Sequence, residues 1–131
     1  MKWLAMMAWL LASAAQAQIW TCEMQPRVLG ESRHGEPVTH IFTQPPPDED
    51  GFVFITEKFT TDLEYNVEWV VLRENDALIE MMMLRPYPTE VEQAVLFKKD
   101  RRAVKTLLMA DVPAVLVDQG SCDIHEAVTA D

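Results

Sequence analysis

The chain has few glycines and few basic residues, and each shortage excludes a class of protein. Its 131 residues include only four glycines, and neither a phosphate-binding loop nor a dinucleotide-binding fingerprint is present. Its 11 Lys and Arg stand against 21 Asp and Glu, which gives a formal net charge of −10. Such a surface repels phosphate groups, so we predict no nucleic-acid partner.

Long apolar runs are also scarce, and the one at the N-terminus belongs to a recognisable signal. Lys2 precedes an apolar run at residues 3–11, and small residues follow as far as Ala17. This order of charge, apolar run and A-x-A site is typical of a secretory signal peptide. No other run approaches the roughly 20 residues of a membrane-spanning helix, so we predict no membrane span in the mature chain.

The signal divides the chain into three predicted parts. Residues 1–17 are the signal peptide, 18–125 form a single β-rich domain, and 126–131 form a flexible tail. The mature chain of 131 less 17, or 114, residues is the size of one domain and carries a charge of −11 once Lys2 is removed. We therefore expect an acidic protein in the periplasm or secreted from the cell.

There are only two cysteines, one near each end of the mature chain. In an oxidising compartment Cys22 and Cys122 have a single possible pairing, so we predict a disulfide. Their spacing does not match a C-x-x-C redox or metal motif. Bulky Ile19 and Trp20 before Cys22 also argue against a lipid anchor at that cysteine.

Short runs of alternating apolar and polar residues predict strands along most of the chain. These runs are bounded by turn-forming clusters such as the proline-rich loop 45–51. The central pair is joined at residues 73–76 and predicts a hairpin, with Trp69 and Met81 on faces that meet in the core. The runs that we expect to form strands are 20–24, 38–43, 52–59, 65–72, 77–84 and 114–117.

The segment 89–109 admits two structures. Thr89 and Glu92 fit a helix capping box, and the apolar spacing after them fits a helix. The charged cluster at 98–102, however, separates two apolar runs as a turn would, which favours a second hairpin. We therefore predict an all-β or mostly β fold, an antiparallel meander, barrel or sandwich of about seven or eight strands closed by one terminal disulfide.

Two features suggest metal binding, although neither predicts a dedicated site. Met81 and Met83 share one strand face and carry soft thioether ligands that suit copper, but methionine is also a common core residue. An acidic loop before Gly51 places Glu57 at the twelfth position of a calcium loop, yet Pro46 occupies the first position. We predict no metal site and no cofactor.

The sequence contains no recognisable catalytic motif. His34, His40 and His125 lie outside any nucleophile-and-base pattern, and His40 shares a strand face with apolar residues as a core histidine does. The carboxylate pair Glu90 and Glu92 is interpreted as surface charge. We predict no catalytic residue, although a small exported hydrolase that uses His34 or His40 stays an alternative.

The leading hypothesis for function is a non-catalytic exported module that binds a protein or an envelope component. A sharper form is an inhibitor of a basic enzyme, because the acidic surface would attract a cationic target. A copper-binding protein is a further alternative, and the oligomeric state stays open. The residues predicted to contact a partner lie in one acidic loop and one basic turn: Asp48, Glu49, Asp50, Lys98, Lys99, Arg101 and Arg102.

In outline, a signal peptide, a small β domain and terminal cysteines resemble the small periplasmic inhibitors of lysozyme. The inhibitory loop of that family has a Ser-Gly-x-x-Tyr signature, which this sequence does not contain. The resemblance therefore implies an architecture and assigns no residue a role.

Overall fold

The structure is a computed structural model that describes residues 16–33, 35–46, 54–60, 62–83, 90–109 and 111–128. Every regular element within these ranges is a β-strand. The strands are β1 (Gln16–Val28), β2 (Val38–Gln44), β3 (Phe54–Phe59), β4 (Asp62–Glu74), β5 (Leu78–Met83), β6 (Glu90–Phe97), β7 (Arg102–Met109) and β8 (Val112–Val128).

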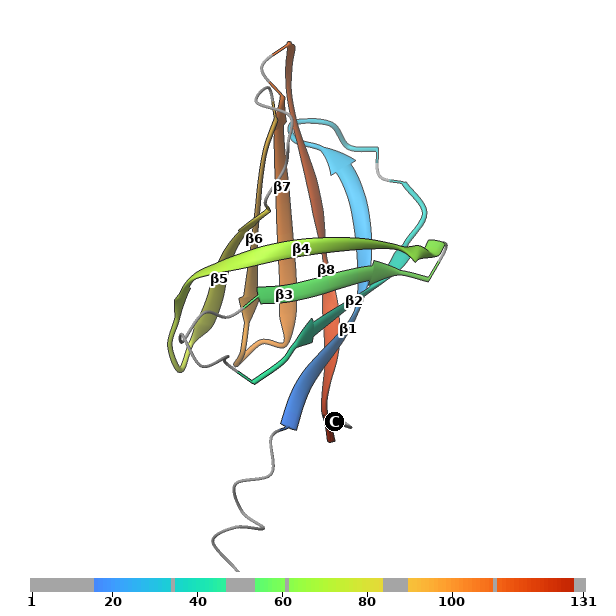
Figure 1. Ribbon diagram of the computed structural model, residues 1–131. Coiled ribbons are helices and arrows are strands. Elements are labelled where there is room, and N and C mark those ends of the chain that lie inside the picture. Colours follow the sequence, from blue (N-terminus) through green and yellow to red (C-terminus); the bar gives the residue numbers. More distant parts are fainter. Residues whose placement is uncertain are drawn as a thin grey trace, which may run out of the picture.

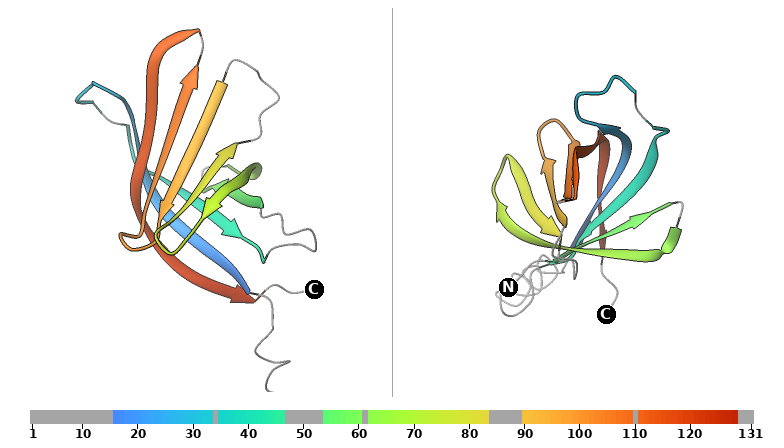
Figure 2. Two further views of the ribbon diagram at one scale, coloured as in Figure 1. Left: turned by 90° about the vertical axis from the view of Figure 1, so that its left-hand side faces the viewer. Right: turned by 90° about the horizontal axis from the view of Figure 1, so that it is seen from above.

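The eight strands form a closed antiparallel barrel in sequence order, in which β8 pairs back with β1. Figure 1 shows the long strands β1 and β8 side by side, and the view from above in Figure 2 shows the strands following one another around the barrel. The predicted all-β antiparallel fold is confirmed. The choice between an open sheet, a sandwich and a barrel, which the sequence left open, is settled as a barrel.

Both predicted hairpins are present. The β4–β5 turn is held by Asn75, whose side-chain oxygen accepts hydrogen bonds from the backbone N–H groups of Ala77 and Leu78 at 2.8 and 3.0 Å. β6 and β7 pair from Glu90 opposite Met109 to Phe97 opposite Arg102. The helix considered for 89–109 is therefore wrong over the described residues, because strand pairing satisfies the backbone on both sides of this segment.

The final strand is much longer than the predicted run 114–117. β8 continues through Gly120, which lies between Ala103 of β7 and Met24 of β1. A Cβ atom at position 120 would lie 1.5 Å from the backbone oxygen of Glu23. Glycine is needed here because β1 and β8 approach too closely for any side chain.

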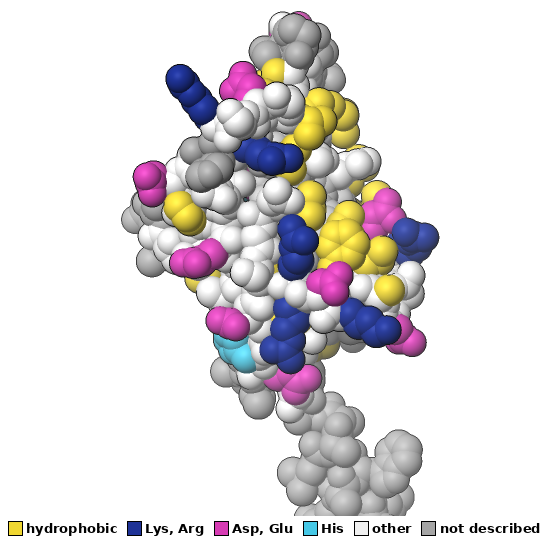
Figure 3. Space-filling view, turned by 180° about the vertical axis from the view of Figure 1, so that it is seen from behind, with side chains coloured by type: hydrophobic (Ala, Val, Ile, Leu, Met, Phe, Trp, Pro, Cys, Tyr) yellow, Lys and Arg dark blue, Asp and Glu magenta, His cyan; other side chains and the backbone are white. Residues whose placement is uncertain are grey.

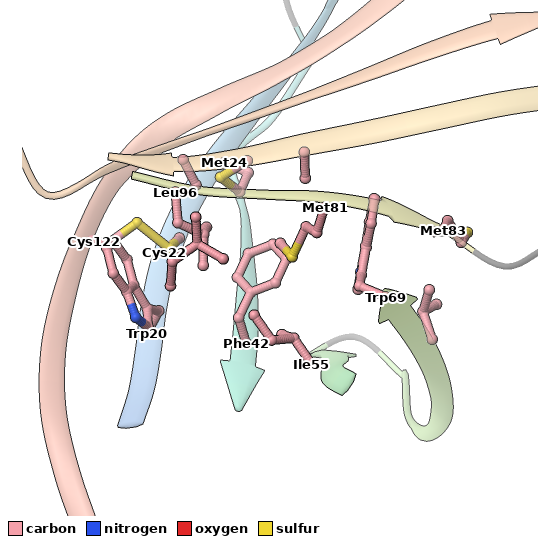
Figure 4. Packing of buried hydrophobic residues seen from close by; sticks show 14 residues of the cluster. Trp20, Cys22, Met24, Phe42, Ile55, Trp69, Met81, Met83, Leu96 and Cys122 are labelled. Atoms are coloured by element: carbon pink, nitrogen blue, oxygen red, sulfur yellow. A yellow bond between two sulfur atoms is a disulfide. The ribbon is translucent and has the colours of Figure 1, made fainter. Parts of the chain in front are cut away.

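The barrel interior contains an apolar core (Figure 4) in which Trp20, Phe42 and Trp69 are fully buried. Met81 and Met83 point into this core, as the alternation predicted, whereas Met82 lies on the outer face and is 37% exposed. Such packing is the ordinary role of methionine in a core. Figure 3 shows that hydrophobic, basic and acidic side chains are interspersed on the rear surface.

Cys22 and Cys122 form the predicted disulfide, directly opposite each other on β1 and β8. This bond indicates an oxidising compartment outside the cytosol. β1 begins at Gln16, which pairs with Val128, and Gln18 pairs with Glu126 of β8. The expected cleavage after Ala17 therefore falls inside β1, and the expected tail from residue 126 overlaps β8. Within the described residues, no helix is long and apolar enough to cross a membrane.

Candidate functional site

Four ionisable side chains meet inside the barrel and are called the charged cluster here: His40, Glu57, Glu92 and Lys105. They come from β2, β3, β6 and β7, respectively. Each occupies an inward position of its strand, because side chains alternate between the two faces of a sheet. Their exposed fractions are 5%, 0%, 7% and 4%, so the cluster is almost entirely removed from solvent.

Glu57 is the centre of the cluster. The Lys105 ammonium donates to both of its carboxylate oxygens, at 2.9 and 3.1 Å. Trp69 Nε1 donates to Oε1 at 3.1 Å, and His40 Nδ1 lies 2.6 Å from Oε2. Because an ionised carboxylate can only accept, Nδ1 is the protonated ring nitrogen of His40. These four hydrogen bonds fill the acceptor capacity of Glu57, which leaves none for a ligand.

Lys105 also lies near a second carboxylate and two aromatic rings. Its Nζ atom is 3.5 Å from Glu92 Oε1, 5.1 Å from the centre of the Phe59 ring and 5.6 Å from that of Trp69. His40 packs edge-on against Phe59 at 4.6 Å between ring centres. The aromatic faces favour the cation and exclude water around it, which strengthens its attraction to both carboxylates.

Burial and charge act on Glu57 in opposite directions. Burial on its own raises the pKa of the Glu57 carboxyl, because it removes the charged form from water. The hydrogen bond from His40, and the charge and hydrogen bonds of Lys105, outweigh burial and hold the pKa of Glu57 below its ordinary value. The formal charges of Glu57, Glu92 and Lys105 sum to −1.

The cluster borders a cavity of about 250 Å³ at one end of the barrel, called the mouth pocket here. This end carries the β1–β2 and β7–β8 connections, whereas the disulfide lies toward the end with the two termini of the barrel. The pocket has apolar walls next to charged groups, a combination that is typical of ligand sites. Its lining residues are Pro26, Arg27, Glu92, Lys105, Thr106, Leu107, Leu116 and Asp118.

The described residues among those predicted to contact a partner lie away from this site. Lys98 lies in the β6–β7 turn, at the opposite end of the barrel, where its ammonium pairs with Glu74 at 3.0 Å. Lys99 and Arg101 are exposed in the same turn, and Arg102 begins β7, which agrees with a solvated hairpin tip. The loop residues Asp48, Glu49 and Asp50 lie outside the described residues.

The sequence predictions for individual ionisable residues are confirmed at some positions and wrong at others. His40 is the buried core histidine that its strand face predicted, and His125 is exposed within β8. His34 lies outside the described residues. Glu92 was interpreted as surface charge, and this is wrong, because its strand turns it into the barrel beside Lys105. Glu57, which the sequence suggested only as a weak calcium ligand, pairs with Lys105 instead.

Lys105 is not among the residues that the sequence predicted to form a site. Strand alternation places residue 105 on the same face as Ala103 and Leu107, but Val104 and Leu108 make the other face equally apolar, so the sequence carries no clear signal for a buried Lys105. In the part of the chain that the structure describes, no group of three or more His, Cys, Asp or Glu side chains is arranged to hold a metal ion.

Comparisons with protein-family models, with curated proteins and with solved structures give no match to this chain.

Proposed function

We propose that this protein is an exported, non-catalytic binding module whose binding site is the mouth pocket. Export to the periplasm or beyond the cell is supported by the signal-like N-terminus and by the disulfide. The group held in the pocket is a free small molecule of the envelope or a side chain of a partner protein. The hairpin tip at residues 98–102 is a second candidate with less support, because its side chains are exposed or, at Lys98, already paired with Glu74.

The observation that carries this proposal is a cavity that adjoins buried charges. A buried ion pair contributes little net stability, and replacing one with apolar side chains is often neutral or stabilising. Lys105 and Glu92 nevertheless line a cavity that also has three apolar wall residues. Rigid strands hold these groups in place, as a preorganised site requires.

Blocking the mouth pocket tests the proposal. Leu107 lines the pocket, whereas the next residue, Leu108, is on the outer face and 49% exposed. We expect Leu107→Trp to fill the cavity and Leu108→Trp to leave it open, although both add the same bulk to β7. The two variants thus form a matched pair.

The probe is a set of small fragments of five to seven heavy atoms, divided into neutral, anionic and cationic members. The measurement is the shift of backbone amide NMR signals during titration. Binding should move signals around Leu107 and Leu116 in the wild type and in Leu108→Trp, but not in Leu107→Trp. The proposal fails if no fragment of any charge moves these signals, or if Leu107→Trp binds as well as the wild type.

Export is tested separately by native mass spectrometry under non-reducing conditions, on protein recovered from the exported fraction of its host. The expected mass is that of a chain starting at Gln18, less two hydrogens for the disulfide. A mass that includes residues 1–17 would contradict the signal peptide.

One observation favours the hydrolase alternative enough to test it. A short hydrogen bond of 2.6 Å between His40 and a carboxylate is a pairing that also orients catalytic histidines. Its carboxylate, however, is shared with Lys105 and Trp69, which is the pattern of a structural centre. An esterase or peptidase activity that is present in the wild type and lost in His40→Gln, while folding is unchanged, would favour the hydrolase over the binding module.

A further inference from the structure

The charged side chains around the mouth pocket differ in how many hydrogen bonds and ion pairs they already make within the protein. Lys105 directs its ammonium across the barrel to Glu57, with a longer approach to Glu92. Asp118 has a different position. Its backbone lies opposite Lys105 on one side and opposite Pro26 on the other, so its carboxylate faces the interior of the barrel.

Asp118 is the group that a ligand would meet. Within the part of the chain that the structure describes, its side chain makes no hydrogen bond and no ion pair. It is half-buried and lines the mouth pocket. A half-buried carboxylate has lost part of the water that would otherwise solvate it, so a positively charged donor placed in the cavity gains a charge-assisted hydrogen bond.

The ionisable side chains inside this end of the barrel are mostly acidic, like Asp118 itself. Glu57, Glu92 and Asp118 contribute three negative charges, and Lys105 contributes one positive charge. The formal charges of these four side chains at this end of the barrel therefore sum to −2. Arg27 also borders the pocket, but it is exposed, and strand alternation directs its side chain to the outer face.

We propose that the mouth pocket selects an aliphatic ammonium group, which it binds through Asp118 with support from the negative potential of Glu92. This inference rests on the proposed binding function and names its ligand chemistry. The cavity of about 250 Å³ is smaller than the pockets of drug-sized ligands and suits a short alkyl ammonium. Pro26, Leu107 and Leu116 provide the apolar contact for the alkyl part. The formal net charge of −10 attracts such a cation over a longer range.

Three probes of one shape test the sign of the charge: 3-methylbutan-1-amine, 3-methylbutan-1-ol and 3-methylbutanoate. Affinities are measured by NMR titration of the wild-type protein at pH 7.5 and low salt. We expect the amine to bind at least tenfold more tightly than the alcohol, and the carboxylate to show no binding. If the alcohol or the carboxylate binds as tightly as the amine, the ammonium inference is overturned while the proposed function stands.

A matched pair of variants locates the interaction on β8. Asp118→Asn removes the carboxylate inside the barrel, and Asp123→Asn makes the same change at an exposed position of the same strand. Asp118→Asn should weaken amine binding by tenfold or more and leave the alcohol unchanged, whereas Asp123→Asn should change neither. Equal effects of the two variants on the amine would overturn the role of Asp118.

The same ammonium chemistry has two sources, a free amine or the lysine side chain of a partner. An acetylated and amidated Gly-Lys-Gly peptide distinguishes them. Binding of the peptide at the affinity of the free amine supports a partner's lysine, and binding of the free amine alone supports a small-molecule ligand. If neither compound nor any neutral or anionic probe binds, both the ammonium inference and the proposed function fail.

Discussion

Replacing Lys105 with methionine keeps a long unbranched side chain but removes the cation at the centre of the barrel. The change leaves Glu57, which is fully buried, with hydrogen bonds from His40 and Trp69 but without the ammonium that lies 2.9 Å away. It also removes the cation near Glu92. Deleting one partner of a buried ion pair costs about 3–5 kcal/mol. We expect a loss near the lower limit, about 3 kcal/mol, because the two remaining donors still satisfy part of Glu57.

The measurement is urea unfolding followed by tryptophan fluorescence, to which the buried Trp20 and Trp69 contribute. Lys58→Met is the control, because Lys58 is adjacent to Glu57 on β3 but exposed, and we expect a change within about 0.5 kcal/mol. The Lys105→Met deficit should shrink as the pH falls, because removing Lys105 raises the pKa of the Glu57 carboxyl and protonation then removes the uncompensated charge.

A further variant keeps the test valid if Lys105→Met does not fold. Combining it with Glu57→Gln removes both charges of the pair, so the double variant should be more stable than Lys105→Met alone. A loss for Lys105→Met no larger than that for Lys58→Met, or a deficit that is independent of pH, would refute the account of the cluster.

Three more predictions concern stability. Changing both Cys22 and Cys122 to alanine should lower the free energy of unfolding by about 4–5 kcal/mol in urea, because the disulfide closes a loop with a sequence separation of 100; a loss below about 1 kcal/mol would contradict this. Gly120→Ala should cost more than about 2 kcal/mol in thermal unfolding, since its Cβ atom would meet the backbone of Glu23 at 1.5 Å; an unchanged midpoint would show that the strands move apart freely. The wild type should be more stable to unfolding than Glu57→Gln, and this difference should be complete above the ordinary glutamate pKa of about 4.3. It should decline as the pH falls below that value, because the pKa of Glu57 is lowered in the folded state and the unfolded chain takes up the proton first. A difference in stability that is constant from pH 6 to 3 would contradict the lowered pKa.

The sequence predicts the strands of this barrel better than it predicts which face of each strand lies inside. On β4, buried Val67 and Trp69 alternate with exposed Asn66 and Glu68, and on β5 exposed Met82 lies between buried Met81 and Met83, so the faces are clear. On β7 the two faces are equally apolar, with Ala103 and Leu107 on one and Val104 and Leu108 on the other. Periodicity alone therefore could not place Lys105 inside.

On β6, alternation favours the wrong face. Val91 and Val95 make one face more apolar than the face that carries Glu92 and Ala94, yet Glu92 is 7% exposed and Val91 is 46% exposed. Pairing with β5 and β7 sets the orientation of the strand, and that pairing is a property of the closed barrel. The cluster was missed because it depends on several registers at once.

The disagreement between local pattern and final orientation at Glu92 is itself an argument for function. A barrel selected for stability alone would have Val91 inside and Glu92 in water, because a buried ion pair rarely stabilises the folded state more than well-packed apolar side chains do. Departures from local consistency tend to occur at functional sites. Here the departure lies beside the mouth pocket, whereas the layer around the disulfide is apolar. One end of the barrel therefore supplies the stability that allows the other end to keep charged groups in a preformed cavity.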